Sequence, residues 1–184
     1  MNDLLTRLYQ RLASPWMALA FTVPAIFLGA RLMRGNASLP ADAPTILHLQ
    51  LAFTPQRFQA VLAAWDQAII HEFLTTLWMD YLYAASYGLA LASWLAWLSR
   101  KGNQPPSRGA LTLFALPLIA GLADWLENTL HFFMIAIHHN ASAHLVFLAS
   151  LAASIKWLAI LLSFLALLAL LLRRWTAAVR RGAT

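Results

Sequence analysis

The stretch GLADWLENTLHFFMIAIHH, residues 121–139, determines how the whole chain is interpreted. It belongs to an apolar run long enough to cross a membrane, yet it carries Asp124, Glu127, Asn128 and His131 within eight residues. A charged side chain at the bilayer centre costs about 2.5–3.5 kcal/mol on insertion scales, so such groups usually face the interior of a helix bundle and pair there. The stretch therefore predicts a membrane helix with a polar site on one face.

The composition indicates an integral membrane protein. The 184 residues are 61% hydrophobic and 11% charged, whereas soluble domains are about half apolar and about a quarter charged. The absence of cysteine excludes disulfides, thiolate metal sites and thiol catalysis. The net charge of +6 does not indicate nucleic-acid binding, because the basic residues lie mainly beside apolar stretches. There they set orientation and contact anionic lipid headgroups.

Four apolar stretches predict an all-α integral membrane protein built as a four-transmembrane-helix bundle. We place the helices at residues 15–31, 73–99, 109–137 and 143–172, since a span needs about 20 apolar residues. The first and shortest stretch could instead be a signal peptide, but no clear small-x-small cleavage site follows it. We therefore expect a retained helix and a single membrane domain covering residues 1–184.

Basic residues predict the orientation of the bundle. They precede the first span, separate the second from the third and follow the fourth, whereas the connection between the third and fourth has no Lys or Arg. By the positive-inside rule, both termini and the loop at residues 99–109 are cytoplasmic. We expect the bacterial inner membrane as the location, although Arg31 and Arg34 oppose this orientation mildly.

Residues 32–70 then form a long extracytoplasmic segment between the first two spans. Residues 46–53 alternate apolar and mixed side chains, which predicts a short strand or extended segment. Thr54 is a good N-cap and Pro55 suits the first helical position. We therefore expect an amphipathic helix from residue 55 to about residue 66, which would cap the bundle or lie on the bilayer surface.

Charged residues from all four predicted spans fall at one depth. At a rise of about 1.5 Å per residue, they lie about 24–30 Å from the cytoplasmic edge. This is near the outer boundary of a hydrocarbon core about 30 Å thick. The residues concerned are Arg31, Asp80, Asp124, Glu127 and Lys156. Helical periodicity places the polar residues of each span on one face, so we expect these faces to meet inside the bundle.

This convergence defines the candidate site. The candidate catalytic residues are Asp80, Asp124, Glu127, His131 and Lys156. The candidate ligand-binding residues are Tyr83, Tyr87, Asn128 and Arg31. If all of the charges meet, three acids face two bases, and the excess acid would need a cation or a proton.

The function that we favour is binding or processing of a lipid or another amphiphilic small molecule. Apolar walls with a few convergent polar groups suit such a ligand; an acid could transfer protons and Lys156 could stabilise an anion. The sequence has no Ser/His/Asp nucleophile motif, no HExxH and no Gly-rich phosphate loop, so the residues name no reaction. The expected partners are membrane lipids and either another membrane protein or a second copy, and no nucleic acid.

Other interpretations fit the same residues. The charges could form a structural ion-pair network, or the chain could be a non-catalytic accessory or assembly subunit of a membrane complex. Metal or proton handling is a third class, although ion transport by so small a chain would require oligomers. Histidines on the outer side give a weak metal signal, and a haem between His71 and His131 fits their depth. These histidines are His48, His71, His131, His138, His139 and His144. We assign no metal ligand.

Overall fold

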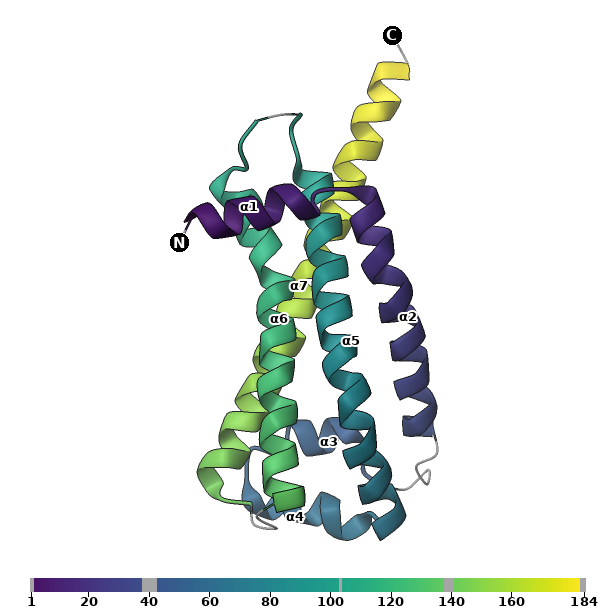
Figure 1. Cartoon of the computed structure of the whole chain (residues 1–184), viewed down its shortest axis with the longest axis vertical. Coiled ribbons are helices and arrows are strands. Elements are labelled where there is room, and N and C mark those ends of the chain that lie inside the picture. The colour runs from purple at the N-terminus through teal and green to yellow at the C-terminus, as the bar shows by residue number, and fades with distance from the viewer. Residues whose placement is uncertain (1, 38–42, 103, 138–140, 183–184) are drawn as a thin grey trace.

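The structure is a computed structural model that describes residues 2–37, 43–102, 104–137 and 141–182. Figure 1 shows four long helices running side by side, with a short helix across one end and two short helices across the other. The long helices are α2 (Pro15–Ala37), α5 (Gln67–Ser99), α6 (Arg108–Phe132) and α7 (Ala143–Gly182). A turn of π-helix, Phe133–Ile137, follows α6. The described part of the chain contains no strand, so the predicted all-α class is confirmed.

Three of the long helices are long and apolar enough to cross a membrane. They are α2, α6 and α7, with apolar spans at Pro15–Arg34, Arg108–Ala136 and Ala143–Arg181. The remaining long helix, α5, is not among them, and its sequence carries Asp80 and several Tyr, Trp and Ser residues. It packs against α2, α6 and α7, and it lies between α2 and α6 in Figure 1.

Glycines bring α5 and α6 close together. A Cβ atom added to Gly121 would lie 3.0 Å from the carbonyl oxygen of Ala84, and one added to Gly88 would lie 3.0 Å from that of Pro117. Small residues at such positions let two helix backbones approach each other. The spacing of the two helices at mid-length is therefore set by backbone contact.

The helix across the upper end in Figure 1 is α1 (Asn2–Leu12). Its Tyr9 is buried, donates a hydrogen bond of 2.9 Å to the carbonyl oxygen of Ala96, and packs edge-on against Phe114. Arg7 and Arg11 on the same helix are exposed. This amphipathic helix therefore lies against the ends of α5 and α6 with its basic side outward.

The expectation of a strand at residues 46–53 is wrong, because the segment begins with the short helix α3 (Ile46–Gln50). The backbone N–H of Thr45 donates to Nδ1 of His48 over 3.1 Å, which stabilises the first turn. Leu49 is fully buried, so the turn gains apolar burial. A lone strand would have left its backbone groups unpaired, since no other strand exists among the described residues.

The helix predicted after Thr54 is present as α4 (Pro55–Ala64), two residues shorter than expected. The hydroxyl of Thr54 accepts the backbone N–H of Arg57, as an N-cap does. We call α3 and α4 the cap, because they lie across the lower end of the bundle in Figure 1. Phe58 of α4 is 1% exposed and belongs to the core there.

Two hydrogen bonds attach the cap to α7. The backbone N–H of Phe53 donates to Oγ of Ser150 over 2.9 Å. Nε1 of Trp157 donates to Oε1 of Gln50 over 3.2 Å. The cap therefore has a fixed position relative to the helix that carries Lys156.

Gly121→Ala should lower the melting temperature of the purified protein in detergent, because the new methyl group meets the carbonyl oxygen of Ala84. Overpacking of this kind costs about 1–3 kcal/mol. Gly109→Ala is the matched control on the same helix, since a Cβ at Gly109 meets nothing within 4 Å. Replacing this glycine should leave the melting temperature unchanged or raise it slightly. Equal melting temperatures for the two variants would contradict the close packing of α5 on α6.

Candidate functional site

The side chain of Lys156 joins α7 to α6 inside the bundle. Its Nζ lies 3.2 Å from Oδ1 of Asp124 and 2.6 Å from Oε2 of Glu127. Lys156 is 4% exposed, and the two acids are 3% and 0% exposed. Buried alanines on the same face of α7 allow the close approach of the two helices. One ammonium group thus neutralises one of two neighbouring carboxylates and attracts both.

A second set of contacts links this ion pair to α5. Nδ2 of Asn128 donates to Oδ2 of Asp80 over 3.1 Å and makes a longer contact of 3.5 Å with Oδ1 of Asp124. The hydroxyl of Tyr87 donates to Oδ2 of Asp124 over 3.0 Å. Because α5 and α6 are closely packed at their glycines, the side chains of Asn128 and Tyr87 can bridge the two helices. We call Asp80, Asp124, Glu127, Asn128 and Lys156 the polar cluster.

His131 extends the site toward the cap. Its ring stacks on Phe58 at 5.8 Å between centroids and meets Phe73 edge-on at 6.2 Å. Nδ1 of His131 lies 3.8 Å from Oε1 of Glu127, which is beyond hydrogen-bond distance. Nε2 of His131 and Oε1 of Glu127 are buried without a hydrogen-bond partner among the described residues. The end of the site nearest the cap therefore has a carboxylate oxygen and a ring nitrogen without hydrogen-bond partners among the described residues.

A cavity of about 870 Å³ lies beside the polar cluster. Its walls come from α2, α5, α6 and α7, and Gln50 and Trp65 of the cap region line it as well. α2 packs along α5 and hardly touches α7. Between α2 and α7, the cavity is lined by residues that are also exposed at the surface: Ile26, Met33 and Phe164. The cavity thus extends from a charged interior to an apolar surface.

Arg31 does not join the other predicted site residues. Its side chain is exposed, and none of the ion pairs found within the described ranges includes it. Ala30 and Met33 of α2 line the cavity, whereas Arg31 lies on a different face of the helix. The structure therefore does not bring Arg31 into the site, and the balance within the site becomes three acids against one base. The other eight predicted residues line the cavity: Asp80, Tyr83, Tyr87, Asp124, Glu127, Asn128, His131 and Lys156.

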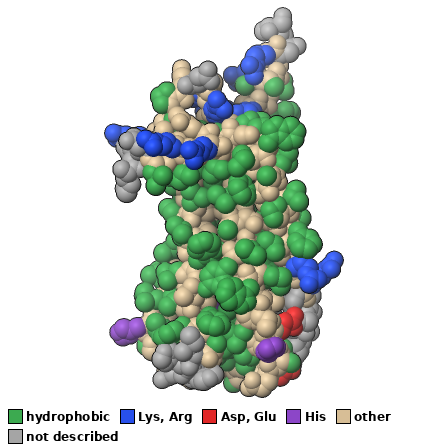
Figure 2. All heavy atoms as spheres, viewed as in Figure 1, with side chains coloured by type: hydrophobic (Ala, Val, Ile, Leu, Met, Phe, Trp, Pro, Cys, Tyr) green, Lys and Arg blue, Asp and Glu red, His purple; other side chains and the backbone are tan. Residues whose placement is uncertain are grey.

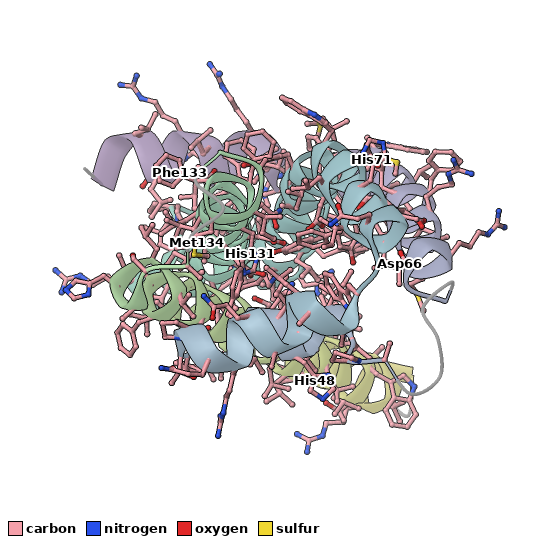
Figure 3. All side chains as sticks on the ribbon, turned by 90° about the horizontal axis from the view of Figure 1, so that it is seen from below. His48, Asp66, His71, His131, Phe133 and Met134 are labelled. Carbon is pink, nitrogen blue, oxygen red and sulfur yellow. The ribbon has the colours of Figure 1, made fainter. Side chains whose placement is uncertain are left out.

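The histidines do not assemble into a metal or haem site in the part of the chain that the structure describes. Within it, no group of three His, Asp or Glu residues is placed to hold a metal ion. Figure 3 shows His131 inside the ring of helices and His48 and His71 near its edge, and both of the latter are exposed. His71 is exposed and His131 is buried, so the arrangement gives no support to the alternative of a haem between them. His138 and His139 lie outside the described residues.

Some residues of the site could not be assigned from the sequence. Phe58 has the apolar spacing of an amphipathic helix, but this pattern does not reveal that its ring stacks on His131. Thr22 and Trp94 also line the cavity, where Nε1 of Trp94 donates to the hydroxyl of Thr22. In the sequence, the only indication of this contact between α2 and α5 is that Thr22 is a polar residue within an apolar span.

Comparison with known proteins finds no matching family model, no matching curated protein and no matching solved structure. The chemistry of the site is therefore the basis for assigning a function. The cluster offers carboxylate acceptors and a fixed positive charge at the end of an apolar cavity. This arrangement suits a molecule with one polar end and one apolar end.

Lys156→Met should destabilise the protein strongly, because it leaves Asp124 and Glu127 buried without their cation. Removing one partner of a buried ion pair costs about 3–5 kcal/mol. Lys101→Met is the control, because Lys101 is exposed in the loop before α6. Thermal unfolding in detergent measures both variants.

The triple variant Lys156→Met, Asp124→Asn, Glu127→Gln tests whether pairing causes this loss. It removes the unpaired charges together with the cation, so it should recover much of the stability. A Lys156→Met variant as stable as the Lys101→Met control would show that the ion pairs do not form.

Proposed function

We propose that the protein is a polytopic membrane protein that binds a lipid or another amphiphilic small molecule in the cavity between α2 and α7. The observation that carries this proposal is the cavity itself, which combines a buried polar cluster with apolar walls that reach the surface. Its volume of about 870 Å³ lies within the range of about 300–1,000 Å³ typical of small-molecule sites.

The cavity has a direction that suits such a ligand. Its polar residues gather around Asp80 and Lys156, and the cap lies beyond them. Toward the α1 end, its lining is mostly apolar and includes Ala25, Leu91 and Leu167. A ligand would therefore place its head at the polar cluster and its chain along the membrane interior.

We also propose that α5 is the fourth membrane span and that both termini face the cytoplasm of a bacterial cell. Figure 2 shows Lys and Arg side chains gathered at the end that carries α1 and the far part of α7, and a band without charged side chains below them. A smaller basic group lies beside the lower end of α2. The positive-inside rule supports this orientation because most of the basic side chains lie at one end. In this orientation the polar cluster would lie in the outer half of the membrane and the cap on its outer face.

Single cysteines can test this orientation, because the chain contains none. Gln56→Cys places a thiol on the exposed surface of α4, and Gln104→Cys places one in the loop before α6. In spheroplasts, a membrane-impermeant maleimide should label Gln56→Cys at once, and Gln104→Cys only after the membrane is permeabilised. The opposite labelling pattern would reverse the orientation.

Filling the cavity should remove the bound ligand. Ala25 lines the cavity and is half-buried, so Ala25→Phe directs a large ring into it. Native mass spectrometry after release from mild detergent should then show about tenfold less bound amphiphile than in the wild type, which corresponds to about 1.4 kcal/mol.

Ala20→Phe is the matched control, because Ala20 is exposed on the same helix and does not line the cavity. Melting temperatures and gel-filtration profiles check that both variants fold. A wild-type protein that is released bare would contradict ligand binding and favour a structural ion network in an accessory subunit. Equal bound mass in both variants would place the ligand elsewhere.

A further inference from the structure

The wall of the cavity is rich in acidic residues. Five residues that line it carry a formal charge at neutral pH, and only one of them is basic: Glu72, Asp80, Asp124, Glu127 and Lys156. The cavity therefore has an excess of carboxylates in a setting of low dielectric, where charges interact strongly.

Lys156 does not balance all of this charge. Its ammonium group already lies 3.2 Å from Asp124 and 2.6 Å from Glu127. Asp80 receives a hydrogen bond from the neutral amide of Asn128. No Lys, Arg or His among the described residues forms an ion pair with Asp80. Asp80 thus borders the cavity as a carboxylate that forms no close ion pair with a cation of the described residues.

A second observation points to a ligand that can donate hydrogen bonds. Oε1 of Glu127 is fully buried and has no hydrogen-bond partner within the described ranges. Glu127 and Asp80 both line the same cavity. A buried acceptor without a donor costs about 1–3 kcal/mol, more when it is charged. A ligand would have to displace the side chains that bury this atom, so the head of the ligand is expected at Asp80, which is only partly buried.

Aromatic rings complete a site for a cation. The rings of Tyr83 and Tyr87 lie 5.1 Å apart between centroids, and both residues line the cavity close to Asp80 on α5. Ring faces attract ammonium groups within about 6 Å of the centroid. The ring of Trp157 already interacts in this way with Lys156, whose Nζ lies 5.3 Å from its centroid.

We propose that the cavity selects an amphiphile with a protonated amine head, which pairs with Asp80. The inference rests on the proposed function and adds the charge of the head group to it. The ammonium lies between Asp80 and the ring of Tyr83 and donates hydrogen bonds to the carboxylate of Asp80. The alkyl chain follows the apolar lining toward Leu91 and Leu167.

The test compares probes that share one chain and differ in the head. Dodecylamine, dodecanol and dodecanoate are added at equal mole fractions to the full-length protein in a neutral maltoside detergent, and native mass spectrometry counts the bound probe. Dodecylamine should bind best. Asp80→Asn should weaken dodecylamine binding by at least about tenfold, because a charge pair in a buried site is lost. Binding of dodecanol should change little.

Asp66→Asn is the matched control. Asp66 is exposed on the N-cap of the same helix, does not line the cavity, and Asn keeps the capping function. It should bind dodecylamine like the wild type. Melting temperatures show whether both variants fold, and if Asp80→Asn does not, Asp80→Glu replaces it and should retain the preference for the amine head.

The outcomes separate the two proposals. Methylammonium carries the head without the chain, so displacement of dodecylamine by equal amounts of methylammonium would indicate a small-cation site and overturn the inference. Binding of all three chains without regard to head charge, or without regard to Asp80, would overturn the inference and leave amphiphile binding intact. Binding of none of them, in a wild-type protein that is also released bare, would overturn both.

Discussion

The pairing of Lys156 with two carboxylates is the interaction on which the site depends. Asp124 and Glu127 lie about one turn apart on α6, and a single ammonium group contacts both of them. Charges in an apolar interior are tolerated when they stay paired. This requirement fixes the height of α7 against α6, and the cap follows because it is bonded to α7 through Ser150 and Trp157.

The second constraint is the distance between α5 and α6. The glycines at positions 88 and 121 meet backbone carbonyl oxygens of the facing helix. At this spacing the amide of Asn128 can reach Asp80, and the hydroxyl of Tyr87 can reach Asp124. Larger side chains at the glycines would separate the helices and break the polar cluster into two parts. Backbone packing and side-chain chemistry therefore depend on each other in this region.

Much of the cluster could be predicted from the sequence, because residues three and four apart share one face of a helix. This periodicity correctly grouped Asp124, Glu127 and Asn128 with Lys156, which lies at a matching depth. Depth alone also selected Arg31, which is exposed instead. Depth does not determine rotation about the helix axis, and rotation is decided by packing against neighbouring helices. Residues 46–53 were predicted to be extended because their side chains alternate. This short pattern does not reveal that His48 accepts a hydrogen bond from the backbone of Thr45, which favours a helical turn instead.

One structural feature gives the cavity an unequal construction. The helices α5, α6 and α7 pack against one another, whereas α2 packs mainly on α5 and hardly touches α7. The walls formed by α5, α6 and α7 therefore support one another, whereas the wall formed by α2 is held mainly along its contact with α5. Tilting α2 about that contact would widen the opening on the α7 side without separating Lys156 from its acids. Under the proposed function, a ligand would enter between α2 and α7 without breaking a buried ion pair.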